Sequence, residues 1–191
     1  MSITDIEKTI LFARACDEQR DDLSMSMAVN SAWDGQQLQS FLDRYIEQLP
    51  VSLKTAAMAA RQLSLEDTVE PILQAVESFF VSECELSTQG GLAALLDRTY
   101  LGHRLLEELN DHLFVRTGHY LIHTDMTEAN LMAHGLLGEP YASELDGVVA
   151  QTLDALTDAL HASHRVQRNT NAEQMLKPFA VQGDKRLKLP Y

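Results

Sequence analysis

The chain is 191 residues long, and its 45% hydrophobic and 23% charged residues are typical of a globular protein and not of a disordered one. Its formal net charge of −13 argues against nonspecific attraction to nucleic-acid phosphates or to anionic lipid. No apolar run reaches the roughly 20 residues that a membrane-spanning helix needs, and the first residues carry no secretory-signal pattern, so we expect a cytoplasmic protein.

The first half of the chain has apolar residues at helical spacing, separated by breaks rich in Ser, Asn, Asp and Gly. This pattern predicts four helices, over residues 3–22, 36–49, 51–63 and from Ser64 onward with Pro71 near the first turn. Pro50 is expected to end the second helix or to open the third, because proline cannot donate a backbone hydrogen bond. Residues 23–35 are predicted to form a connection, and Met25, Met27 and Met58 are expected to fill the core.

The second half of the chain predicts three helices, over residues 92–114, 125–137 and 141–161. A loop is expected before them at residues 87–91, where the chain reads Ser-Thr-Gln-Gly-Gly. Gly118 marks the stop after the first of the three, because glycine adopts the left-handed conformation of a helix C-terminus at little cost. Asp125 and Glu128 have the spacing of a capping box that opens the short helix.

Six or seven helices and no sheet make the expected fold an all-α, single-domain multi-helix bundle, which we place at residues 1–162. Residues 163–191 lose the helical period and are expected to form an extended tail. The tail holds six Lys or Arg against two acidic residues, a local charge of +4, so the rest of the chain carries −17. A basic arm on an acidic body favours exchange of tails between two copies, which predicts a homodimer, with a flexible, solvated tail as the alternative.

The candidate site is a set of polar side chains at the edge of the apolar stripe of the 92–114 helix. His103, Glu107 and Asn110 occupy positions i, i+4 and i+7, so one helix face presents all three. With a second pair from the short helix, the predicted ligand-binding residues are Tyr100, His103, Glu107, Asn110, Asn130 and His134. If the two helices pack antiparallel, the imidazoles of His103 and His134 are expected to reach one shared acid or ligand. The loop between the helices adds three polar side chains that could approach from one end, His119, His123 and Asp125.

Three interpretations fit this candidate site. The first is a hydrogen-bonded polar group that fixes the register of the helices, and the second is a pocket for a small ligand. The third is a metal-dependent enzyme with His103, Glu107 and His134 as ligands, because imidazole and carboxylate bind zinc, iron and nickel. The sequence contains neither the Glu-x-x-His pair of di-iron bundles nor His-Glu-x-x-His, so it identifies no cofactor.

The sequence holds no Gly-x-Ser-x-Gly elbow and no glycine-rich phosphate loop, so it leaves enzymatic activity open. Residues 127–146 have the outline of a helix-turn-helix. Its second helix, however, presents Glu144 and Asp146 and no Lys or Arg, which argues against nucleic-acid binding. We therefore expect a non-catalytic module that binds a small molecule or a protein and acts as a homo-oligomer. An acidic adaptor that binds a basic protein partner is a further alternative.

Overall fold

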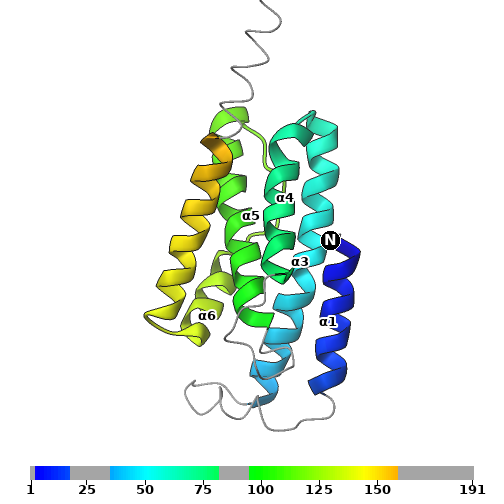
Figure 1. Ribbon diagram of the computed structural model, residues 1–191, viewed down its shortest axis with the longest axis vertical. Helices are drawn as coiled ribbons and strands as arrows, with labels where there is room; N and C mark the ends of the chain where they lie inside the picture. The colour runs from blue at the N-terminus through cyan, green and yellow to red at the C-terminus, as the bar shows by residue number, and fades with distance from the viewer. Residues whose placement is uncertain (1–2, 18–34, 82–94, 159–191) are drawn as a thin grey trace, which may run out of the picture. The chain divides into compact units, whose positions relative to one another are not determined.

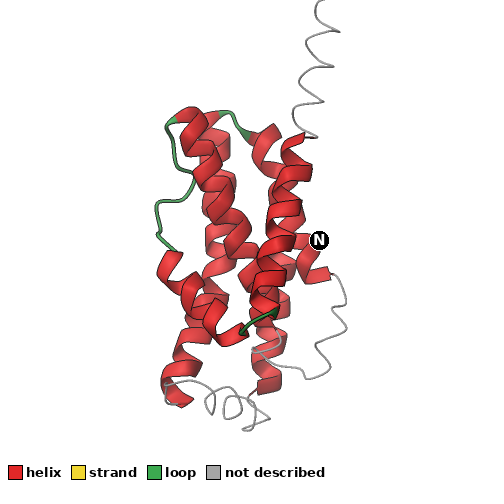
Figure 2. Ribbon diagram, turned by 90° about the vertical axis from the view of Figure 1, so that its left-hand side faces the viewer, coloured by secondary structure: helices red, strands yellow, loops and turns green. Residues whose placement is uncertain are grey.

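The computed structural model describes residues 3–17, 35–81 and 95–158 of the chain. These residues are 89% helical, in six helices and without a strand (Figure 2). The all-α bundle expected from the sequence is thus confirmed. Three predicted segments lie outside the described residues: the 23–35 connection except Gly35, the loop at 87–91, and the tail at 163–191.

Contacts between residues divide the chain into two units, Met1–Leu153 and Asp154–Tyr191. The second unit is described only over residues 154–158, so the expected domain boundary after residue 162 stays a prediction. The candidate site belongs to the first unit, and the helix over residues 141–158 crosses the boundary between the two.

The helices are α1 Ile3–Asp17, α3 Gly35–Leu63, α4 Glu66–Val81, α5 Leu96–Thr117, α6 Thr127–Leu137 and a helix over residues 141–158. Helices α3, α4 and α5 each contact the other two, α1 packs on α3 and α4, and α6 packs on α5 (Figure 1). Their inward-facing side chains form an apolar core that includes Ile6, Leu38, Ile46, Leu49, Leu53, Ile72, Leu96, Leu105 and Leu109. Within the described ranges, no helix is both long and apolar enough to cross a membrane.

Helix α3 runs through Pro50, where the sequence predicted a break between two helices. The apolar residues on the two sides of Pro50 lie on one buried stripe, which continues from Ile46 to Leu53. Burial of this continuous stripe outweighs the roughly 3 kcal/mol that an interior proline costs a helix. The two predicted helices are therefore one helix of 29 residues, with Pro50 buried inside it.

The ends of α5 and α6 follow the expected signals in part. Gly118 is left-handed, with φ 73°, and its N–H bonds the carbonyl of Phe114 at 2.8 Å, which confirms the glycine stop. At the start of α6, Asp125 Oδ1 accepts the N–H of Thr127 at 2.9 Å, but Met126 occupies the N-cap position. The capping box was thus wrong in register, because Asp125 lies one residue too early and makes a local turn instead.

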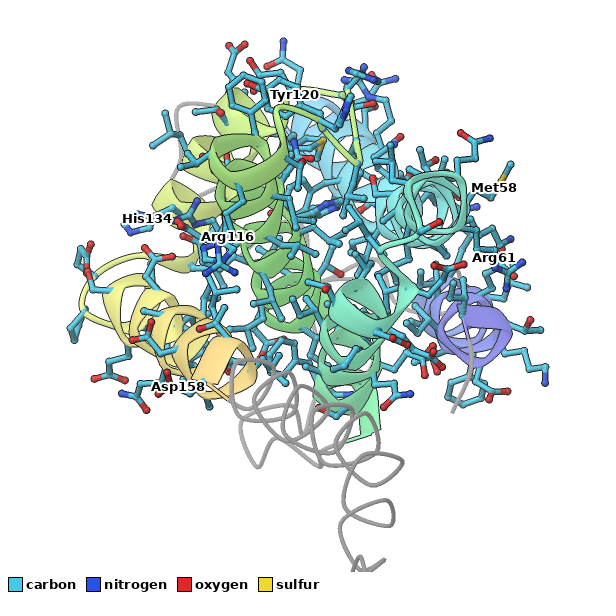
Figure 3. All side chains as sticks on the ribbon, turned by 90° about the horizontal axis from the view of Figure 1, so that it is seen from above. Met58, Arg61, Arg116, Tyr120, His134 and Asp158 are labelled. Carbon is cyan, nitrogen blue, oxygen red and sulfur yellow. The ribbon has the colours of Figure 1, made fainter. Side chains whose placement is uncertain are left out.

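Met58 is 63% exposed on the outer face of α3, so the prediction that it fills the core was wrong (Figure 3). Ala56 and Ala60 are almost fully buried on the same helix. Because consecutive helical residues are turned by about 100° from one another, the position midway between these two alanines faces away from the core. Met25 and Met27 lie outside the described residues.

Candidate functional site

Helix α5 carries the candidate site where it meets α3, α6 and the connection at residues 118–126. Its leucines fill the core, and its polar residues lie at the border of that apolar face. The 118–126 connection leaves the end of α5 at Gly118 and runs back along the helix before α6 begins (Figure 2). This return path brings loop side chains next to the middle of α5.

His103 is a buried histidine, only 1% exposed, on the inner side of the site. Its Nε2 lies 2.9 Å from the backbone oxygen of Tyr45 on α3. A carbonyl oxygen only accepts hydrogen bonds, so Nε2 carries the proton and Nδ1 carries the lone pair. Burial lowers the pKa of His103 to about 4, so the ring is neutral at neutral pH. Among the described residues, Nδ1 has no hydrogen-bond partner.

Glu107 is the centre of a polar network that joins three helices. Its carboxylate accepts hydrogen bonds from Thr127 Oγ1 and from Asn130 Nδ2, each at 2.8 Å, and from Arg104. Asn130 in turn accepts a hydrogen bond from the hydroxyl of Tyr45 at 2.7 Å. The chain of bonds therefore runs from α3 through α6 to α5, and it satisfies the buried amide of Asn130 on both sides.

Arg104 extends this network to the helix over residues 141–158. Its Nε donates to Asp146 Oδ1 at 3.2 Å, and Tyr100 donates its hydroxyl proton to the same oxygen at 2.8 Å. Burial lowers the pKa of Arg104, but its hydrogen bonds and charge pairs with Glu107 and Asp146 outweigh that effect and raise the pKa overall. Burial, together with Asp146, raises the pKa of Tyr100, so that hydroxyl stays a donor.

His134 belongs to the far side of this network. Its Nε2 lies 3.4 Å from Glu139 Oε1 and 3.7 Å from Asp146 Oδ2, and its ring meets the edge of Tyr100. These contacts are separate from those of His103, so the two imidazoles share no acid among the described residues, and the expectation of a shared ligand stays a prediction. The positive charge that joins Glu107 to Asp146 is the guanidinium of Arg104, a residue that was not among those predicted from the sequence.

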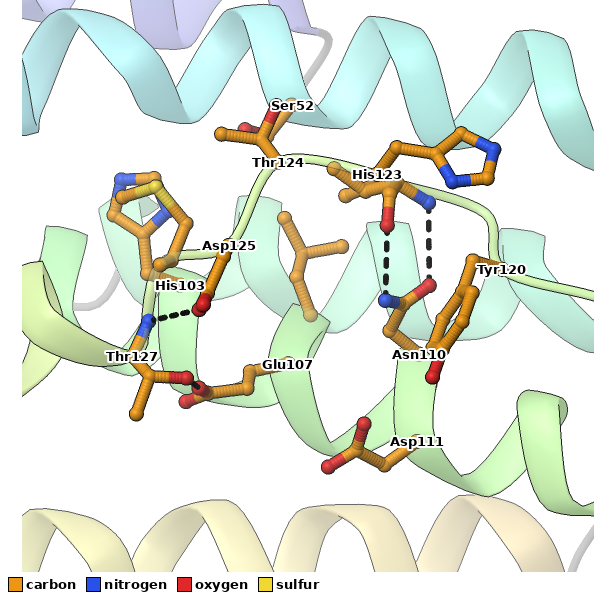
Figure 4. Close-up of a pocket in the computed structure, with 13 residues that line it drawn as sticks. Ser52, His103, Glu107, Asn110, Asp111, Tyr120, His123, Thr124, Asp125 and Thr127 are labelled. Carbon is orange, nitrogen blue, oxygen red and sulfur yellow. Dashed lines mark hydrogen bonds between the residues drawn. The ribbon is translucent and has the colours of Figure 1, made fainter.

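Asn110 has a different role, because it holds the 118–126 connection (Figure 4). Its Oδ1 accepts the N–H groups of Leu121 and Ile122 at 2.8 and 3.1 Å. Its Nδ2 donates to the carbonyl of Ile122 at 3.0 Å. One side-chain amide thus satisfies three buried backbone groups and fixes the loop against α5.

A pocket of about 340 Å³ opens between α5, the 118–126 connection and the start of α6 (Figure 4). It is lined by Ser52, His103, Leu106, Glu107, Asn110, Asp111, Tyr120, Ile122, His123, Thr124, Asp125, Met126 and Thr127. Half of the predicted ligand-binding set lines it, namely His103, Glu107 and Asn110. The others, Tyr100, Asn130 and His134, belong to the polar network and do not line the pocket.

Two of the three loop residues expected at one end of the site, His123 and Asp125, line the pocket, whereas His119 does not. Tyr120 also lines the pocket and was not among the residues predicted from the sequence; its ring stacks on Phe114 with centroids 4.1 Å apart. Asp111, which follows Asn110 directly on α5, was likewise not predicted. The exposed aromatic pair on both sides of the Gly118 stop was a signal that could have identified Tyr120.

The ligand set expected for a metal-dependent enzyme is not assembled here. Over the described ranges, no group of three or more His, Cys, Asp or Glu residues is placed to hold a metal ion. His103 Nε2 is bonded to a backbone oxygen, and Glu107 is paired with Arg104. Comparison of the chain with protein-family models, with curated proteins and with solved structures gives no match.

Proposed function

We propose that this protein is a non-catalytic module that binds a small organic molecule in the pocket between α5 and the 118–126 connection. The observation that carries the proposal is a pocket whose wall includes His103, a buried side chain whose Nδ1 has no hydrogen-bond partner among the described residues. A buried polar atom without a partner costs about 1–3 kcal/mol, and a ligand that donates a hydrogen bond would remove this cost.

The environments of His103 and Glu107 favour binding over catalysis by these two residues. With a pKa of about 4, His103 is a weak base at neutral pH, far from the value near 7 that suits a general base. Glu107 has both carboxylate oxygens engaged, with Thr127 on Oε1 and with Asn130 and Arg104 on Oε2. A carboxylate held in this way is suited to fixing the shape of a site more than to exchanging protons with a substrate.

The proposal is tested by titrating a mixed set of neutral, cationic and anionic small molecules into the labelled protein and following its amide NMR resonances. We expect a subset of compounds to shift the amides of residues 103–111 and 120–127. Thr124→Trp should fill the pocket from its exposed rim and abolish these shifts, whereas Gln151→Trp, an exposed substitution on another helix, should preserve them. Shifts that persist in Thr124→Trp, or an absence of shifts with every compound, would refute the proposal.

The homodimer and the cytoplasmic location expected from the sequence stay predictions. Removing residues 164–191 and measuring the mass in solution tests the exchange of tails, because a dimer held by tails should become a monomer. The acidic adaptor is the alternative to a small-molecule ligand. It predicts that a basic protein partner binds the Thr124→Trp variant as well as the unchanged protein, because adaptor binding would use the outer helix faces and not the pocket.

A further inference from the structure

The charges around the pocket indicate which class of molecule it takes. Three carboxylates line it, those of Glu107, Asp111 and Asp125, and none of the described residues that line it is Lys or Arg. Glu107 is already paired with Arg104, a cation that it shares with Glu108 and Asp146. Two carboxylates, on Asp111 and Asp125, are therefore left to act on the contents of the pocket.

The pocket lining also holds groups that can donate as well as accept, namely the hydroxyls of Ser52, Tyr120 and Thr124 and the imidazole of His123, so net charge and not hydrogen-bond type sets its preference. His103 is fixed as the Nε2–H form by the Tyr45 carbonyl, so its Nδ1 can only accept a hydrogen bond. The hydrogen bonds that Asp125 accepts from Thr127 lower its pKa and keep it ionised. At the rim, the ring of Tyr120 lies stacked on Phe114 and meets the edge of His123 at 6.1 Å, and such a ring face attracts cations.

We propose that the ligand is a small organic amine that enters the pocket as an ammonium ion. This inference rests on the proposed function. The ammonium group would be attracted by the carboxylates of Asp111 and Asp125, which line the pocket together with the buried, unpartnered His103, and its apolar part would lie against Leu106, Ile122 and the ring of Tyr120. A neutral alcohol would lack the charge attraction, and an anion would be repelled by both aspartates.

The test uses three probes of nearly the same shape and different charge: benzylamine, benzyl alcohol and benzoate. Affinities are measured by NMR titration of the full chain at low salt. We expect benzylamine to bind about tenfold more tightly than benzyl alcohol, and benzoate to bind more weakly than both. Added sodium chloride should weaken the binding of benzylamine and leave that of benzyl alcohol unchanged.

Variants that each remove one carboxylate show which residues cause the preference for benzylamine over benzyl alcohol. Asp111→Asn and Asp125→Asn should each reduce the advantage of benzylamine over benzyl alcohol severalfold, since asparagine keeps the size of the side chain and can still accept the Thr127 N–H at position 125. Glu144→Gln removes the same charge from an exposed position outside the pocket and should leave the advantage unchanged. In the unchanged protein, the ¹⁵N resonance of His103 Nδ1 should move when benzylamine binds.

The outcomes separate this inference from the proposed function. If all three probes bind in the pocket with equal affinity, or if Asp111→Asn and Glu144→Gln behave alike, the amine is ruled out while the pocket remains a binding site. If neither the three probes nor the mixed set of compounds shifts the amides that line the pocket, both ideas are wrong.

Discussion

Arg104 and Asp146 lie 42 residues apart in the sequence and meet through Nε and Oδ1 at 3.2 Å. This contact ties α5 to the helix over residues 141–158. The same guanidinium also pairs with Glu107 and Glu108 of its own helix. One cation is thus shared by three carboxylates behind the pocket and offsets part of their charge, which helps to explain how Glu107 can lie only 19% exposed.

Replacing Arg104 by methionine should destabilise the protein by about 2–3 kcal/mol, because Glu107 would remain partly buried without its cation. Arg104→Lys should cost less, since it keeps the charge but not the three directed contacts. The measurement is urea unfolding at neutral pH. Arg14 provides the control: its pairs with Asp43 and Glu47 are more exposed, so Arg14→Met should cost less than about 1 kcal/mol. Equal costs for the two methionine variants would contradict the central role of Arg104.

Replacing Asn110 by alanine should release the 118–126 connection from α5. The backbone groups of Leu121 and Ile122 would lose three hydrogen bonds in a buried setting, at a cost of about 1–3 kcal/mol. Asn110→Asp should also loosen the loop, because a carboxylate would face the carbonyl of Ile122. Hydrogen exchange should become faster at the amides of residues 121 and 122, with the amides in the middle of α3 as the internal reference. Unchanged exchange at these two amides would show that Asn110 does not hold the loop.

The helices could be predicted well from the sequence because each one buries a face on which apolar residues recur at helical spacing. The apolar stripe of α5, with Leu105, Leu106, Leu109 and Leu113, is buried as its spacing requires. Local signals failed where tertiary packing opposed them. Proline is a strong helix breaker in isolation, but Pro50 lies inside a helix whose residues on both sides are anchored in the same core.

For the candidate site, the sequence could predict which residues share a face of one helix, but not which residues of different helices meet. His103, Glu107 and Asn110 could be grouped because i, i+4 and i+7 fall on one face, and all three line the pocket. Tyr45 lies 85 residues from Asn130, its hydrogen-bond partner, so no local period could have paired them. The spacing also could not show that Asn110 would bond a loop backbone while Glu107 would bond side chains, since that depends on where the chain returns after Gly118.

Gly102 and Gly135 should respond in opposite ways to substitution by alanine. A Cβ atom at Gly102 would lie 2.9 Å from Leu49 Cδ2 and 3.0 Å from Val76 Cγ1, and both of these side chains are fully buried. Gly102→Ala should therefore destabilise the contact of α5 with α3 and α4 by about 1–3 kcal/mol. A Cβ at Gly135 meets nothing within 4 Å, so Gly135→Ala should stabilise α6 by up to about 1 kcal/mol. Thermal unfolding of the two variants measures both signs, and a stabilised Gly102→Ala would show that the helices are less closely packed there.

His103 should make the protein less stable as the pH falls below about 6.5. Its pKa is about 4 in the folded state and 6.5 when unperturbed, so between these values the unfolded chain binds the proton and the folded protein does not. The stabilisation is complete above pH 6.5, is lost progressively down to about pH 4, and amounts to roughly 3 kcal/mol over that window. His103→Gln can still donate to the Tyr45 carbonyl but cannot titrate. The free energy of unfolding, measured by urea across this pH range, should therefore fall more steeply for the unchanged protein than for His103→Gln. Parallel curves would mean that the imidazole is protonated as readily in the fold as in the unfolded chain.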